Sequence, residues 1–75
     1  MNISAHWLVA DKTGRELDII EAELHDITNA DVDRTDSPCK TGNINARFRV
    51  RGNIHATDLD EACEYMDGVG SAYPV

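Results

Sequence analysis

Few residues of this 75-residue chain could bind a metal, and they are widely spaced: His6, His25, Cys39, His55 and Cys63. Structural zinc sites usually take their ligands in close pairs, separated by roughly two to five residues. No pair here has such spacing, so we expect no zinc site. We expect both cysteines to be reduced thiols in an intracellular protein.

Asp31, Asp33 and Asp36 have a spacing that superficially matches the start of a calcium-binding loop. The segment lacks the central glycine and the closing glutamate of an EF-hand loop, so we expect no calcium site. The chain also contains no GxSxG, Walker A or GxGxxG motif. We therefore expect a protein that is not an enzyme and that needs no cofactor.

Three of the seven basic residues occupy alternate positions: Arg47, Arg49 and Arg51. A row of arginines on an open sheet face could bind phosphates, but this row has no aromatic residues interleaved on the same face. If residues 15–22 form the neighbouring strand, its outward side chains continue with Glu21, Glu23 and His25. We favour the structural interpretation, in which cross-strand pairs with these glutamates neutralise the arginines.

The strand that carries the arginines is the clearest element of the sequence. Seven alternate positions are apolar or glycine: Ile44, Ala46, Phe48, Val50, Gly52, Ile54 and Ala56. A period of two held this long indicates a half-buried β-strand. A second strand is predicted over residues 3–9, where Ile3, Ala5, Trp7 and Val9 share one face, with Trp7 as a core anchor. Residues 11–14 have the composition of a turn.

Residues 15–28 allow two interpretations. As a strand, the alternation slips by one residue at Ile19-Ile20, where a β-bulge would restore one inward face. As a helix, Thr13-x-x-Glu16 fits a capping box, and four residues share one face: Leu17, Ile20, Leu24 and Ile27. We favour the strand over residues 15–22, with one or two helical turns after Ala22. Residues 29–42 are polar and indicate a long loop.

A C-terminal helix is predicted from residue 57 to residue 67. Thr57 or Asp58 could cap it, and Gly68 is suited to the C′ position. Its apolar face consists of Leu59, Ala62, Cys63 and Met66. The tail from Val69 to Val75 has no period, and we expect it to fray or to pack over a sheet edge.

Together these elements predict one small α+β domain, in which an antiparallel sheet of three or four strands has the C-terminal helix packed on one face. A core this small gives marginal stability, to which dimerisation or partner binding would add. No apolar run is long enough to span a bilayer, and the first residues do not resemble a signal peptide. We therefore expect a cytoplasmic protein.

The net charge of −7 is unevenly distributed. Residues 16–36 contain eight acids and one arginine, and residues 58–67 contain five acids and no base, whereas residues 37–57 contain four bases. Such a chain repels nucleic acid and membrane phosphates but attracts a basic protein surface, although solubility alone would also explain the charge. Carboxylates on alternate strand positions lie roughly 6.8 Å apart, close to the spacing of phosphates along one nucleic-acid strand. The candidate partner-binding residues are Asp31, Asp33, Asp36, Asp58, Asp60, Glu61, Glu64 and Asp67.

The segment from Phe48 to Ala62, a strand that leads directly into an acidic helix, resembles the small acidic phage-encoded anti-CRISPR proteins. The resemblance lies in size, charge and architecture and covers about a fifth of the chain. It implies an inhibitor whose acidic surface occupies the DNA-binding site of an RNA-guided CRISPR surveillance complex in the host cytoplasm. Two alternatives are open: an antitoxin-like or immunity-like partner of a basic nuclease, and a structural module that forms a homodimer or larger assembly through a sheet edge.

Overall fold

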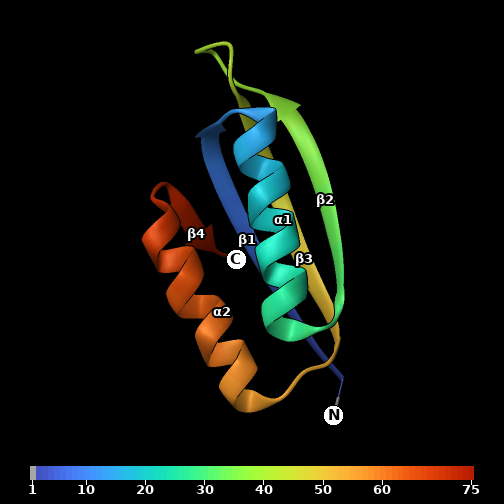
Figure 1. Cartoon of the computed structure of the whole chain (residues 1–75). Helices are drawn as coiled ribbons and strands as arrows, with labels where there is room; N and C mark the ends of the chain where they lie inside the picture. Colours follow the sequence, from blue (N-terminus) through green and yellow to red (C-terminus); the bar gives the residue numbers. More distant parts are fainter. Residues whose placement is uncertain (1) are drawn as a thin grey trace.

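The computed structural model describes residues 2–75 and has six elements (Figure 1). They are β1 (Asn2–Lys12), α1 (Gly14–Thr28), β2 (Asp31–Pro38), β3 (Ile44–Asn53), α2 (Ala56–Val69) and β4 (Ala72–Pro74). The strands form one antiparallel sheet in the order β2-β3-β1-β4. The predicted α+β class and antiparallel sheet are confirmed. Each helix connects two strands that flank a third, which is the split β-α-β arrangement of ferredoxin-like folds.

Both helices lie on the same side of the sheet, and the core fills the space between them and the strands (Figure 1). Because side chains alternate along a strand, odd residues of β1 pair in register with even residues of β3 and share the covered face. Trp7 lies opposite Phe48 in this register, and their side chains are 4% and 0% exposed. The predicted core anchor is therefore confirmed.

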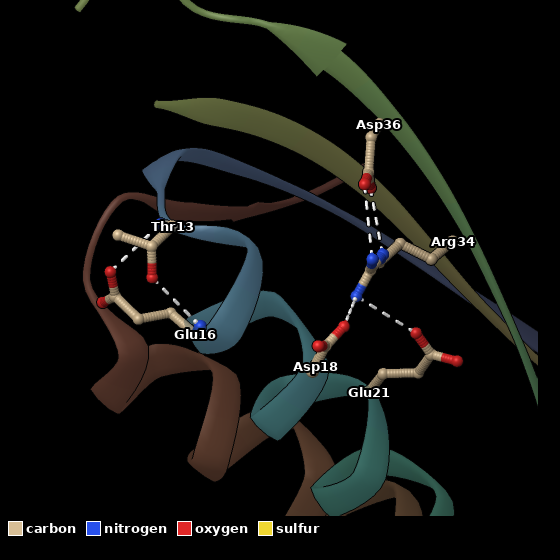
Figure 2. Close-up of polar contacts among 6 residues, drawn as sticks. All are labelled: Thr13, Glu16, Asp18, Glu21, Arg34 and Asp36. Carbon is tan, nitrogen blue, oxygen red and sulfur yellow. Dashed lines mark hydrogen bonds and ion pairs between the residues drawn. The ribbon is translucent and has the colours of Figure 1, made fainter. Parts of the chain in front are cut away.

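The segment after the first strand is a helix, so the favoured strand over residues 15–22 is wrong and the helical alternative is correct. The Thr13 hydroxyl accepts a hydrogen bond from the Glu16 amide at 3.2 Å, and the Glu16 carboxylate accepts one from the Thr13 amide at 3.1 Å (Figure 2). This capping box satisfies two amides that the first helical turn leaves unpaired. Leu17 and Leu24 are fully buried, whereas Ile19 is 54% exposed. The alternation through Ile19 is thus accidental.

Residues 31–38 form edge strand β2, so the predicted loop over residues 29–42 is wrong except at its ends. Only residues 39–43 join β2 to β3, in a turn closed by a hydrogen bond from the Cys39 amide to the Asn43 carbonyl at 3.1 Å. The sequence does not indicate β2 because nearly all of its side chains are polar. Val32 is the one aliphatic residue among its eight.

The C-terminal helix is confirmed, but its ends differ from those predicted. It begins at Ala56, before either predicted cap, with His55 at the N-cap position and no side-chain hydrogen bond capping it. Neither Thr57 nor Asp58 caps the helix, and Gly70, with a φ of 79°, follows its last residue in place of Gly68. Ala62 and Met66 are buried as predicted, whereas Cys63 is exposed.

The tail packs over a sheet edge, which was one of its two predicted alternatives. Residues Ala72–Pro74 form β4 and pair with β1, placing Tyr73 opposite Leu8. Within the residues that the structure describes, no helix is long and apolar enough to cross a membrane.

Candidate partner-binding surface

The two helices carry most of the acidic residues of the protein. Each contains five, so ten of the fourteen acids lie on one side of the sheet, together with a single basic residue, Arg15. The sequence places these acids in two separate blocks. The fold brings the blocks together, because α1 and α2 lie side by side over the same face (Figure 1).

Within residues 2–75, seven of these ten carboxylates form no ion pair and no side-chain hydrogen bond. They are Glu23 and Asp26 of α1 and Asp58, Asp60, Glu61, Glu64 and Asp67 of α2. All are exposed except Asp58, which is half-buried. We call these seven residues the acidic helical face. They include all five residues that the sequence predicts on the C-terminal helix, and they add two on α1.

The negative charge of this face affects the pKa values of neighbouring groups. Partial burial and then the charges of Asp60 and Asp67 raise the pKa of the Cys63 thiol. Partial burial raises the pKa of the Tyr65 hydroxyl, and the Glu23 carboxylate on the other helix adds to this. A carboxylate of α1 therefore lies close enough to α2 to act on one of its side chains.

Like charges also face each other along α2. Glu61 and Glu64 are three positions apart, and Asp60 and Glu64 are four apart, spacings at which helical side chains are neighbours. Each such pair costs roughly 0.2–0.5 kcal/mol on an exposed helix. Glu64 and Asp67 also lie in the C-terminal half of α2, where negative charge opposes the helix dipole. A cationic partner would relieve both costs.

The remaining acids of α1 are already paired. Arg34 of β2 reaches across to the helix, where its Nη1 atom lies 2.8 Å from Asp18 Oδ1 and 3.3 Å from Glu21 Oε1 (Figure 2). Its Nε atom lies 3.0 Å from Asp36 Oδ1. The hydrogen bond with Asp18 and the charges of these carboxylates raise the pKa of Arg34. Asp36, a predicted partner-binding residue, therefore already forms an ion pair within the protein.

Asp31 and Asp33, two further predicted partner-binding residues, lie on the opposite face of the sheet. In the register of β2 and β3, Asp31 is opposite Arg51 and Asp33 is opposite Arg49. Asp33 Oδ2 lies 3.9 Å from Arg51 Nη2. The structure thus divides the eight predicted residues into three places, and only the five on α2 form one unpaired surface.

The arginine row is flanked by β2, not by a strand built from residues 15–22, so the predicted pairing of the row with Glu21, Glu23 and His25 is wrong. Those three residues lie on α1. One cross-strand ion pair nevertheless forms, between Arg51 and Asp33, with an aspartate in place of a glutamate. The sequence could have indicated Glu23 and Asp26 as part of the acidic surface, because the capping box at Thr13 and Glu16 starts a helix that leads to them.

The histidines and cysteines are spread over the molecule. His6 lies on β1, His25 on α1, His55 at the start of α2, Cys39 in the β2–β3 turn and Cys63 on α2. Within the described part of the chain, no three His, Cys, Asp or Glu side chains are grouped so that they could hold a metal ion.

Comparisons with protein-family models, with curated proteins and with solved structures find no significant match. The function must therefore be argued from the surface itself.

Proposed function

We propose that this protein is a non-enzymatic binding protein that uses the acidic helical face to occupy a basic, nucleic-acid-binding site on another protein. One observation supports this most strongly: the five acids of α2 form no ion pair with any described residue and share one side of the sheet with Glu23 and Asp26. Solubility alone would not require these charges to be gathered on one side of the sheet.

The spacing of these carboxylates suits a site built for nucleic acid. Side chains three or four positions apart on a helix lie about 5–6 Å apart, close to the step between phosphates on one strand. The field of the face would steer the protein onto a cationic channel, and the bound protein would then exclude DNA or RNA. An RNA-guided surveillance complex presents such a channel, so inhibition of its DNA binding is the specific form of the proposal to test first.

A basic nuclease is the second partner with matching chemistry, and it would make the protein antitoxin-like or immunity-like. Assembly through a sheet edge is less favoured, because both edges carry features that discourage strand addition. β4 has three residues and ends at Pro74, and β2 ends at Pro38 and carries charged side chains at half of its positions.

The experiment is a pull-down from host lysate with tagged protein, washed at low and at high salt and with competing DNA. A retained nucleic-acid-binding protein that salt and DNA both release supports the proposal, and its identity distinguishes a surveillance complex from a nuclease. A retained partner that resists both salt and DNA would contradict it, as would the absence of any retained basic protein.

A further inference from the structure

The sheet face turned away from the helices is a regular grid of side chains, which we call the open sheet face. Reading across β2, β3 and β1, three successive rows are Asp31, Arg51, Ser4; then Asp33, Arg49, His6; then Thr35, Arg47, Leu8. Tyr73 of β4 extends the third row beside Leu8. The two aspartates thus stand in the first two rows, opposite Arg51 and Arg49.

Arg47 is the one arginine of the row without a carboxylate opposite it. Its cross-strand neighbours are Thr35 on one side and Leu8 on the other. Within residues 2–75 its guanidinium forms no ion pair, whereas Arg51 lies 3.9 Å from Asp33. Arg47 is also exposed, so its charge is available to a ligand.

A hollow of about 520 Å³ lies against Arg47. Its wall includes Leu8, Ala10, Thr35, Asn45, Arg47 and Tyr73, which come from all four strands. The hollow exists because the side chains beyond the third row, such as Ala10 and Ser37, are short, while Arg47 and Tyr73 are long. Its volume is within the range of about 300–1,000 Å³ that is typical of small-molecule sites.

The wall of the hollow combines three kinds of chemistry. Leu8 and Tyr73 are 41% and 61% exposed and offer an apolar edge and an aromatic ring. Thr35 and Asn45 offer hydrogen-bonding groups. Arg47 offers a planar guanidinium that binds carboxylate or phosphate with two parallel hydrogen bonds.

We propose that this hollow binds a small organic anion, in which a carboxylate or a phosphate is attached to a flat apolar body. The anionic group pairs with Arg47, and the flat body lies against Leu8 and Tyr73. Arg47 suits a single anionic group better than a chain of phosphates, because aspartates stand opposite Arg49 and Arg51 in the register and the net charge of −7 repels a long polyanion.

The acidic helical face does not prevent this binding. It lies on the other side of the sheet, so its carboxylates are separated from the hollow by the sheet and the core (Figure 1). Arg47 lines the hollow itself and is in direct contact with the ligand. This inference is independent of the proposed partner of the helices.

The experiment is a titration followed by amide chemical shifts, with adenosine monophosphate and 2-naphthoate as probes for the phosphate and the carboxylate form. Either probe should shift the amides of Leu8, Ala10, Asn45, Arg47 and Tyr73. Adenosine lacks the anionic group, and inorganic phosphate lacks the flat apolar body. Each should therefore bind at least about tenfold more weakly.

Two matched variants locate the site. Arg47→Gln removes the unpaired charge from an exposed position and should weaken binding of the better probe by about tenfold or more. Arg51→Gln, on the same strand and face, should leave binding within about twofold, because Arg51 already faces aspartates. The amide spectrum of each variant shows whether it is folded.

Several results would overturn the inference. They are an absence of shifts with both probes, an equal loss of binding in the two variants, and shifts that map to the helices. Concentration-dependent shifts of the same amides without ligand would show instead that a second copy of the chain covers this face.

Discussion

Arg34 Nη1 lies 2.8 Å from Asp18 Oδ1, and this contact joins the edge strand β2 to the first helix (Figure 2). The two residues are sixteen positions apart, and the Arg34 side chain is only 20% exposed. Arg34 holds three carboxylates that would otherwise repel one another. It therefore acts as an anchor for a strand that has few apolar side chains of its own.

Arg34→Gln should destabilise the protein by about 1–2 kcal/mol, because it leaves Asp18, Glu21 and Asp36 close together without a cation. Urea denaturation followed by circular dichroism measures the change. Arg51→Gln is the control, since its single ion pair is long and exposed on both sides, and its effect should stay within about 0.5 kcal/mol. Equal effects of the two variants would show that Arg34 is not an anchor.

Thr13→Ala should cost about 1 kcal/mol, because it removes the hydroxyl that caps the first turn of α1. Thr13→Ser keeps that hydroxyl and should retain most of the stability. Thermal or urea unfolding of the two variants measures the difference. If both substitutions cost the same, the methyl group of Thr13 matters and the capping bond does not.

The stability that Glu16 and Asp11 contribute should be lost as the pH drops below about 4.5. Hydrogen bonds with the backbone and side chain of Thr13 lower the pKa of Glu16, and hydrogen bonds from Thr41 and Asn43 lower that of Asp11. A carboxylate with a lowered pKa in the folded state contributes stability above its unfolded pKa, and this contribution is lost as the pH falls through the folded pKa.

Asp11→Asn tests the pH dependence in urea unfolding between pH 6 and pH 3. Asparagine tolerates the left-handed backbone at this position, where φ is 60°, and does not titrate. The variant should lose less stability on acidification than the wild-type protein does. Equal losses of stability in the variant and the wild-type protein would contradict the assignment.

Neutralising Glu61 and Glu64 together should stabilise the free protein by about 0.3–1 kcal/mol at low salt, because it removes repulsion along α2. The gain should disappear at high salt, where exposed charges are screened. Asp31→Asn with Asp33→Asn makes the same charge change on the open sheet face and should instead destabilise, since these aspartates face arginines. Unfolding at two salt concentrations measures both. A gain from both double variants would mean that net charge alone controls stability.

The elements with a regular apolar period could be predicted from the sequence. Phe48 and Val50 alternate with arginines in β3, and Ala62 and Met66 recur at helical spacing in α2, so each pattern has one interpretation. The Ile19-Ile20 pair, in contrast, fits a bulged strand and a helix equally well by periodicity. The structure is helical here, with a capping box at Thr13 and with Leu17 and Leu24 buried.

Strand β2 could not be predicted because its stability comes from partners outside the segment. Arg34 occupies an inward-facing position that is usually apolar, and it is satisfied by acids on α1. The candidate site could be predicted only in part, for the same reason. The acids of α2 are unpaired whatever the order of the strands. The pairing of Asp31 and Asp33, in contrast, depends on which strand lies beside β3.

The most direct test of the account is the affinity of a purified, basic, nucleic-acid-binding partner, with a surveillance complex first, for three proteins at matched salt. They are the wild-type chain, Glu61→Gln with Glu64→Gln, and Asp31→Asn with Asp33→Asn. We predict that the helix variant binds at least about tenfold more weakly and with a shallower salt dependence, while the sheet variant binds as the wild type does. Equal affinities for all three proteins, or a loss confined to the sheet variant, would contradict a role for the acidic helical face.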